Sequence, residues 1–264
     1  MDVCYRHPKR ETGVHCSNCG RAICPDCMTS TPVGMRCPEC ARQRTPVRTM
    51  RSLGSDPTLT YALIALNVVA YLGSSFGGNV GNSGSLTDAG DLSRAAIASG
   101  DYWTVITSGF LHVNLFHVGS NMLALWILGT LLEPILGHLR FGLVYFVALV
   151  CGSLGVLLLG PEASVGASGA VFGLMGAAII VARNRGLNLM ESGLGLWLGI
   201  NLLITFTIPH ISIGAHIGGL IGGALAALVL LELGDRSGVP RYLPELLCAA
   251  IGVVAVGVSI GQYG

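Results

Sequence analysis

Residues 211–231 read ISIGAHIGGLIGGALAALVLL, a run that contains no aspartate, glutamate, lysine or arginine. About 20 apolar residues in a helix are enough to cross the hydrocarbon core of a bilayer. One histidine, His216, interrupts the run near its start, and glycines recur along it at helical spacing. The run therefore predicts a membrane-spanning helix with a polar side chain close to one end.

Six further stretches lack charged residues in the same way. They are residues 58–76, 115–132, 141–160, 168–182, 193–208 and 246–261. Two of them, 168–182 and 193–208, are short, which predicts helices that are sheltered by neighbours or entered from a re-entrant loop. The chain is 52% hydrophobic and only 11% charged, whereas a soluble domain carries about 25% charged residues. We predict an all-α polytopic membrane protein with seven spans, which excludes an ordinary soluble enzyme, a disordered chain and a basic nucleic-acid binder.

The placement of arginine predicts the orientation of these spans. Alternate connections carry all but one of the arginines that follow the first 41 residues, namely Arg42, Arg44, Arg48, Arg51, Arg140, Arg183, Arg185, Arg236 and Arg241. The opposite set of connections carries only Arg94. Positive charge marks the cytoplasmic side of a membrane protein. We expect a multi-pass protein of the cell membrane with a cytoplasmic N-terminus and an external C-terminus.

The first 41 residues have a different chemistry from the rest of the chain. They contain four ligand pairs, each with a two-residue gap: Cys4 and His7, Cys16 and Cys19, Cys24 and Cys27, and Cys37 and Cys40. This gap lets a tight turn direct two side chains at one tetrahedral metal ion. A disulfide framework is disfavoured in the cytoplasm, where thiols stay reduced. Residues 1–41 are therefore predicted to be a zinc-finger domain with two structural Zn²⁺ sites, because so short a segment buries too little core to fold alone.

The sequence leaves open how the four ligand pairs combine. A cross-braced arrangement joins the first pair to the third and the second to the fourth, and sequential pairing is the alternative. The segment resembles B-box-type zinc fingers in its Cys-x-x-His opening but ends in a Cys-x-x-Cys pair. Fully coordinated sites are structural, so we expect a scaffold or a docking surface for a cytoplasmic protein. Residues 42–57 are interpreted as a basic linker that contacts anionic lipid.

Four polar side chains inside the predicted spans are functional candidates. His117 and Asn121 share one face of the second span, Ser168 begins the fourth, and His216 lies near the start of the sixth. The predicted topology places all four near the external surface. A neutral imidazole can activate a serine, whereas Glu133 lies about 18 Å along the helix from Asn121, too far to orient His216. We predict a Ser168–His216 catalytic dyad that needs no cofactor.

Hydrogen-bond donors and small residues complete this predicted site. The side chains of His117 and Asn121 and the backbone amide of Ser168, at a helix N-terminus, can stabilise an oxyanion. Small residues at helical spacing let two helices approach closely. Glycines of this kind lie on the fourth and sixth spans at Gly169, Gly173, Gly176, Gly219 and Gly223. They are expected to bring Ser168 and His216 together.

Four segments between about residues 100 and 225 carry a family resemblance. They read Phe110-Leu111-His112, His117-x-x-x-Asn121, Gly166-Ala167-Ser168-Gly169 and Ala215-His216-Ile217-Gly218-Gly219-Leu220. Their order and spacing resemble the rhomboid family of intramembrane serine proteases. The resemblance implies a six-helix protease core over residues 58–234, followed by an added C-terminal span within residues 235–264. It departs at Trp103-Thr104, where the family often has Trp-Arg.

The same resemblance implies roles and an activity. Ser168 would be the nucleophile and His216 the base, with His117, Asn121 and the Ser168 amide forming the oxyanion hole. Phe172 would stack on His216, and Glu133 would anchor the second span. The protein would be a serine endopeptidase that cleaves transmembrane segments of membrane proteins within the bilayer, without a nucleic-acid partner. The alternative is a non-proteolytic rhomboid-like protein that binds membrane clients, although such a protein usually lacks the serine or the histidine.

Overall fold

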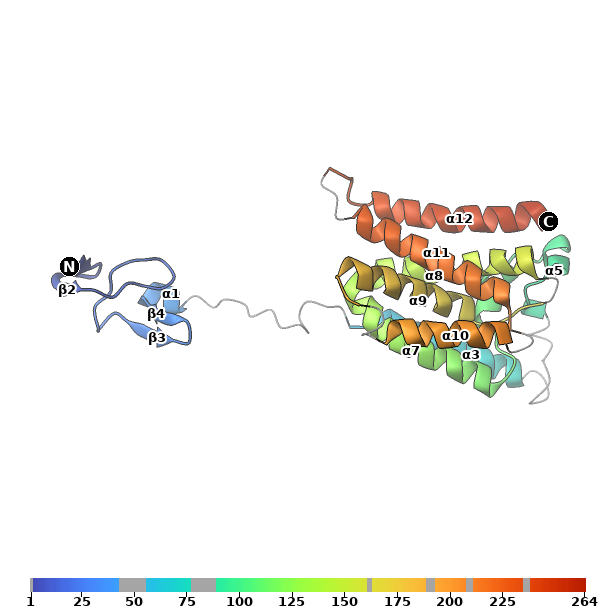
Figure 1. The fold of residues 1–264 in the computed structure, drawn as a ribbon, viewed down its shortest axis with the longest axis horizontal. Helices are drawn as coiled ribbons and strands as arrows, with labels where there is room; N and C mark the ends of the chain where they lie inside the picture. The colour runs from blue at the N-terminus through green and yellow to red at the C-terminus, as the bar shows by residue number, and fades with distance from the viewer. Residues whose placement is uncertain are drawn as a thin grey trace. The chain divides into compact units, whose positions relative to one another are not determined.

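The computed structural model of the chain describes residues 2–42, 56–76, 89–160, 163–188, 193–207, 211–234 and 238–264. The chain divides into two compact units, Met1–Ser52 and Leu53–Gly264, which are described one at a time (Figure 1). Most of the expected linker, with Arg44, Arg48 and Arg51, lies outside the described residues, and so do Arg236 and Ile208.

The first unit is built from two short hairpins and one helical turn. Strand β1 (Asp2–Cys4) pairs antiparallel with β2 (His7–Thr12), and β3 (Thr29–Thr31) pairs antiparallel with β4 (Gly34–Arg36). Helix α1 (Pro38–Arg42) follows. The buried centre consists of Ile23 and six cysteines. A core made mainly of thiols is too small to hold the unit together by apolar burial alone.

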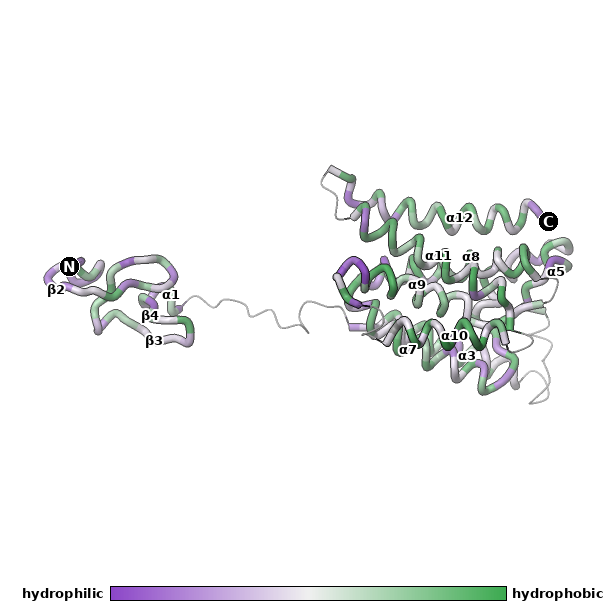
Figure 2. The backbone as a smooth tube through the Cα atoms, in the orientation of Figure 1, coloured by the Kyte–Doolittle hydropathy of each residue, from purple (hydrophilic) through white to green (hydrophobic). Residues whose placement is uncertain are grey.

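The second unit is a bundle of apolar helices, joined in part by short helical segments. The helices expected to cross the membrane are α3 (Thr58–Phe76), α7 (Leu115–Leu136), α8 (His138–Leu159), α9 (Ser168–Asn184), α10 (Leu194–Thr207), α11 (Ile213–Glu232) and α12 (Leu243–Tyr263). Five of these are long and apolar enough to cross a bilayer, whereas α9 and α10 are shorter. The prediction of an all-α polytopic membrane protein is confirmed, and so is the shortness of the fourth and fifth helices. Figure 2 shows apolar residues along every one of these helices.

The connection between α3 and α7 contains helical elements that the sequence did not predict. They are α5 (Arg94–Ala98), α6 (Thr104–Thr107) and the 3-10 turn η1 (Ser108–Phe110). Arg94 donates from Nε to the carbonyl of Leu157 at the end of α8, over 2.7 Å. This bond satisfies a helix-terminal carbonyl and ties the connection to the bundle.

Several helices run beyond the charge-free stretches that predicted them. Helix α7 continues through Glu133, α8 includes Arg140, and α12 includes Glu245. The Nε atom of Arg140 donates to Glu245 over 2.7 Å. The charged residues are tolerated because they pair across helix ends. The predicted spans, which were bounded by charged residues, were therefore shorter than the helices.

Glu133 joins three helix ends inside the bundle. Its carboxylate is fully buried and accepts hydrogen bonds from the backbone amides of Leu59 (2.8 Å) and Thr60 (2.7 Å) at the start of α3. His138, at the start of α8, bonds the same carboxylate over 2.6 Å. Helix N-terminal amides favour a negative charge, so this buried glutamate caps α3. It also anchors α7, as the family resemblance implied.

Replacing Glu133 with alanine is expected to lower the free energy of unfolding of the membrane unit by about 3–5 kcal/mol, because several buried donors lose their acceptor. Thermal unfolding of the purified protein in detergent measures this change. Glu232→Ala, at an exposed position at the end of α11, is the matched control and should unfold as the wild type does. An unchanged unfolding temperature for Glu133→Ala would contradict the capping role.

The helices α8, α9 and α11 form the centre of the bundle, where α11 packs mainly on the other two. A Cβ atom at Gly219 would overlap the carbonyl oxygen of Gly169, and one at Gly223 would overlap that of Gly173. The backbones of α9 and α11 therefore touch along the glycine faces that the sequence predicted. This contact holds the first turn of α9 against the first turns of α11.

Candidate active site

Ser168 is the first residue of α9, and the segment before it is held by backbone hydrogen bonds. Ser164 exchanges two bonds with Leu92, of 2.9 and 3.0 Å, and the amide of Gly166 donates to the carbonyl of Ser108 over 2.9 Å. Gly166 has a φ of +132°, which favours glycine. Ala167 caps α9, and its methyl group cannot accept a bond from the first helical amides. Those amides remain donors at the N-terminus of the helix.

The ring of His117 lies over the backbone of Gly166. A Cβ atom at Gly166 would lie 2.7 Å from Nε2 of His117, so any larger residue there would displace the ring. Asn114 caps α7 and accepts a bond from the His117 amide over 2.8 Å. The Nδ2 atom of Asn121 donates to the His117 carbonyl over 3.0 Å. Since an amide group carries two N–H donors, Asn121 keeps one for another acceptor.

His216 is buried in α11 and held on two sides. Its ring stacks on that of Phe172 from α9, with the centroids 3.9 Å apart and the planes 17° apart. Its Nδ1 atom lies 2.7 Å from Oγ1 of Thr205 in α10. The stack with Phe172 agrees with the interaction that the family resemblance implied.

The residues beside Ser168 and His216 are in direct contact. A Cβ atom at Gly169 would lie 3.2 Å from the carbonyl oxygen of Ala215. Gly169 follows Ser168, and Ala215 precedes His216. The serine and the histidine therefore lie on adjoining first turns of α9 and α11. The ring of His117 lies against Gly166, which precedes the serine by two residues.

A small cavity with both polar and apolar lining residues adjoins this site. Its volume is about 20 Å³, and its lining includes Ser108, Ser153, Ser164, Gly166 and Gly169. A cavity of that size with several polar groups in its lining has room for about one water molecule. The cavity is thus a place for water within reach of the start of α9.

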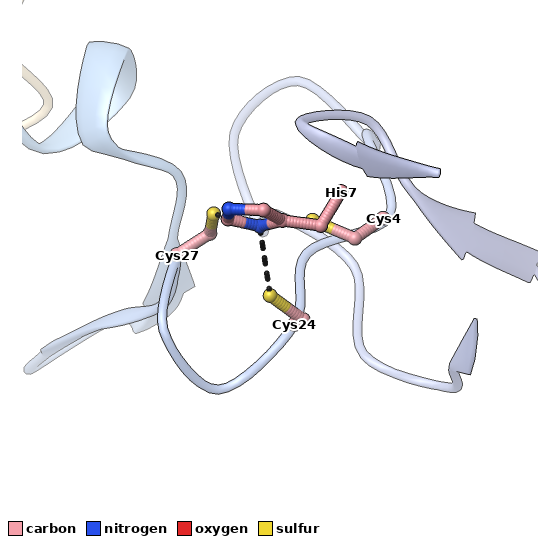
Figure 3. A group of neighbouring side chains, drawn as sticks. All are labelled: Cys4, His7, Cys24 and Cys27. Atoms are coloured by element: carbon pink, nitrogen blue, oxygen red, sulfur yellow. Dashed lines mark hydrogen bonds between the residues drawn. The ribbon is translucent and has the colours of Figure 1, made fainter. Parts of the chain in front are cut away.

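The cysteines and the histidine of the first unit form two groups of four. Cys4, His7, Cys24 and Cys27 make one group, and Cys16, Cys19, Cys37 and Cys40 make the other. The ligand atoms of each group all lie within 4.8 Å of one another. Figure 3 shows the first group, in which the His7 ring points toward the cysteine sulfurs. The ligand pairs combine in the cross-braced arrangement, which settles a choice that the sequence left open.

The distances within these groups fit a tetrahedral metal site. Tetrahedral Zn²⁺ separates two sulfur ligands by about 3.8 Å, and a sulfur and a nitrogen ligand by about 3.5 Å. The Sγ atoms of Cys24 and Cys27 each lie 3.4 Å from Nδ1 of His7. The Sγ atoms of Cys19 and Cys37 lie 3.8 Å apart. The groups have the size that four ligands take around one metal ion.

Hydrogen bonds reach several of the ligand sulfur atoms, and at Cys16 they favour the thiolate form. The amide of Cys40 donates to Sγ of Cys37 over 3.4 Å, and Nδ2 of Asn18 donates to Sγ of Cys40 over 3.3 Å. Hydrogen bonding from the backbone of Cys37 lowers the pKa of the Cys16 thiol to about 6. A thiolate is the form that binds metal.

Comparison with known proteins places this bundle in a family. The family model described as "Rhomboid domain" matches residues 99–233, about half of the chain and the part that holds the candidate active site. The chain belongs to the rhomboid family. Among curated rhomboids, "Rhomboid protease GluP" of Bacillus subtilis (strain 168) is 36% identical over 213 residues, which cover 79% of this chain and 41% of that protein.

Two other rhomboids show how coverage varies. "RHOMBOID-like protein 5" of Arabidopsis thaliana is 34% identical over 170 residues, covering 60% of this chain and 54% of that protein. "Putative rhomboid protease YdcA" of Bacillus subtilis (strain 168) is 32% identical over 145 residues, covering 53% of this chain and 73% of that protein. The chain therefore spans only about half, or less, of the length of GluP and of RHOMBOID-like protein 5.

One residue beside the candidate active site was not predicted from the sequence. Thr205 contacts His216, yet nothing distinguishes its hydroxyl from those of the other threonines in apolar helices. The only available signal was Asn201, four residues earlier, which makes a polar pair on one face of α10. Which face of α10 meets α11 depends on how the helix is rotated, and the sequence alone does not fix that rotation.

Proposed function

We propose that this rhomboid is an intramembrane serine endopeptidase in which Ser168 is the nucleophile and His216 is the general base. One observation carries the proposal: the glycine contacts between α9 and α11 bring together the helical turns that begin at Ser168 and include His216. The family to which the chain belongs includes proteins named as proteases. A serine beside a neutral imidazole is the minimal arrangement for nucleophilic acyl transfer.

In the proposed reaction, Nε2 of His216 takes the proton of the Ser168 hydroxyl as Oγ attacks a peptide carbonyl. The histidine then returns that proton to the leaving amine, and an acyl-enzyme remains. A water molecule, drawn from the cavity beside Gly166 and Gly169, gives its proton to His216 and attacks the acyl group. The free carboxylic acid leaves, and the serine regains its proton.

The developing oxyanion would be stabilised by three donors. These are the backbone amide of Ser168, the remaining N–H group of Asn121 and a ring N–H of His117. The position of the His117 ring over Gly166 and the uncapped first amides of α9 support this assignment. Such donors act strongly where water is excluded.

The substrates would be transmembrane segments of other membrane proteins. A regular helix hides its carbonyls in internal hydrogen bonds, so a substrate must unwind locally before Ser168 can attack it. The arginine distribution supports a cytoplasmic N-terminus and an external C-terminus. This orientation would place the dyad near the outer surface.

A fluorophosphonate probe tests the proposal directly. The wild type should become covalently labelled at Ser168, and Ser168→Ala should not. Labelling of both proteins would show that another residue reacts and would defeat the assignment of Ser168. Labelling of neither protein would also defeat it and would favour a protein that only binds membrane clients. Ser259→Ala, which alters a buried serine of α12 that bonds its own helix, is the control and should be labelled like the wild type.

Phe172→Ala is expected to lower kcat about tenfold, because the His216 ring loses the face on which it stacks. Phe172→Tyr keeps that face and should leave kcat within about twofold of the wild type. Gel-based cleavage of a model membrane substrate measures both rates. Equal rates for Phe172→Ala and the wild type would show that stacking does not position the base.

For the first unit, we propose that the two groups of four ligands each hold one structural Zn²⁺ ion. Thiolate and imidazole donors at tetrahedral spacing suit zinc. We assign residues 1–41 to a zinc finger, 42–57 to a linker, 58–234 to the protease core and 235–264 to the added span. Because each zinc would be fully coordinated by protein, the finger would act as a scaffold or as a docking surface for a cytoplasmic partner.

A further inference from the structure

The Nδ1 atom of His216 has a specific buried partner in the hydroxyl of Thr205. The two atoms lie 2.7 Å apart, and both residues are buried, with Thr205 2% and His216 7% exposed. The partner comes from α10, a different helix from those that carry the serine and the histidine. A buried hydrogen bond of this kind is not readily exchanged for one to water.

A second hydrogen bond fixes the direction of the first. The Oγ1 atom of Thr205 also lies 2.8 Å from the carbonyl oxygen of Asn201, which can only accept. A hydroxyl carries a single proton. Both bonds form together only if Thr205 donates to Asn201 and accepts from Nδ1 of His216. The imidazole must then carry its hydrogen on Nδ1, which leaves the lone pair on Nε2.

We infer that Thr205 is a positioning residue for the proposed protease reaction: it holds His216 in the Nδ1–H tautomer, so that Nε2 is free to accept the proton of Ser168. The catalytic role of this tautomer rests on the proposed function, because it requires that His216 acts as the base for Ser168. The bonding pattern itself concerns only Thr205, Asn201 and His216. Thr205 does not touch the reacting atoms.

The proton balance of the step involves no ionisation of Thr205. The Ser168 proton moves to Nε2, and the imidazole becomes an imidazolium with a hydrogen on each nitrogen. The Nδ1 hydrogen stays on the ring and keeps its bond to the threonine oxygen. The threonine hydrogen stays directed at the Asn201 carbonyl. Two aligned dipoles thus stabilise the positive ring, the role that a carboxylate plays in a Ser-His-Asp triad.

A hydroxyl suits this location better than a carboxylate. A buried carboxylate in a membrane would have to be desolvated, at a large cost in free energy. Thr205 supplies the orienting acceptor without adding a charge. The stack with Phe172 restrains the tilt of the ring, and the bond to Thr205 restrains its rotation within the ring plane, so the two contacts together fix the direction of Nε2.

The tautomer can be measured without any turnover. The full-length protein, labelled with ¹⁵N at histidine, is studied in detergent by long-range ¹H–¹⁵N correlation, and a His216→Gln sample identifies the His216 signals. The wild type and Thr205→Ser should show the Nδ1–H pattern. Thr205→Val should show a mixture of tautomers or the Nε2–H form. Finding His216 as the Nε2–H form in the wild type would overturn the inference.

Cleavage kinetics provide the second readout. Thr205→Val should lower kcat by about tenfold to a hundredfold with little change in KM, and Thr205→Ser should stay within about threefold of the wild type. Thr207→Val is the matched control, because the Thr207 hydroxyl makes the same kind of bond, to Leu203 at 2.7 Å, on an exposed face of α10. It should cleave like the wild type.

The two readouts separate this inference from the proposed function. If Thr205→Val cleaves at the wild-type rate, or if Thr205→Ser is as slow as Thr205→Val, the positioning role is wrong while the protease assignment stands. If the wild type shows the Nδ1–H form but neither cleaves nor reacts with a fluorophosphonate, the protease assignment is wrong. Thermal unfolding of each variant identifies any loss of rate that comes from unfolding.

Discussion

Ser168→Ala is expected to abolish cleavage of a model membrane substrate, with a fall in kcat of at least about a thousandfold. The reason is chemical, because alanine offers no oxygen to attack the peptide carbonyl and no acyl-enzyme can form. His216→Ala should cause a fall of similar size, since the serine would lose the base that takes its proton. Cleavage is followed on gels with the purified protein and a single-pass substrate.

The double variant gives the sharper result. Residues that act as one unit have strongly non-additive effects, so Ser168→Ala combined with His216→Ala should be no slower than either single variant. Multiplying effects would mean that the two side chains act independently, which contradicts a dyad. Ser259→Ala, altered in α12, serves as the control and should keep the wild-type rate.

Cys24→Ser combined with Cys27→Ser is expected to unfold the first unit and to lower its zinc content from two ions to one or fewer. Zinc binding supplies about 10–16 kcal/mol in small fingers, far more than the apolar core of a unit this small can replace. The ligand pairs are interleaved along the chain, so loss of one site loosens the segments that carry the other. Elemental analysis of the full-length protein measures the zinc that remains.

Fluorophosphonate labelling shows whether the two units depend on each other. Labelling of Ser168 should persist in the cysteine double variant, because the membrane helices have their own core. His15→Ala is the control, since His15 lies next to Cys16 but bonds Asp2 over 2.8 Å instead of joining either group. If the cysteine double variant still holds two zinc ions, the proposed zinc site that includes Cys24 and Cys27 is wrong. Lost labelling in a folded membrane unit would reject the independence of the finger.

Much of this protein could be predicted because the signals are local. Freedom from charge over about 20 residues identifies a span without reference to any other part of the chain. A two-residue gap between cysteines identifies a ligand pair in the same way. The first turn of α9 at Ser168, the short helices α9 and α10, and the glycine faces of α9 and α11 followed from such patterns.

The errors of the sequence reading lie where distant segments meet. The ends of α7, α8 and α12 were misplaced because Glu133, Arg140 and Glu245 find partners on other helices. The short helices between α3 and α7 were missed because they pack on the bundle and have no periodic apolar signal of their own.

The sequence by itself determined that the chain is a membrane bundle with a ligand-rich head, and it supplied the candidate serine, the candidate histidine and the eight metal-ligand candidates. Only the tertiary structure decided which ligand pairs come together in each group of four, that Thr205 contacts His216, and that a small cavity adjoins Gly166. The physical reason is that hydropathy and ligand spacing are properties of neighbouring residues. Contacts between helices depend on the rotation and depth of each helix, which the packing of the whole bundle sets.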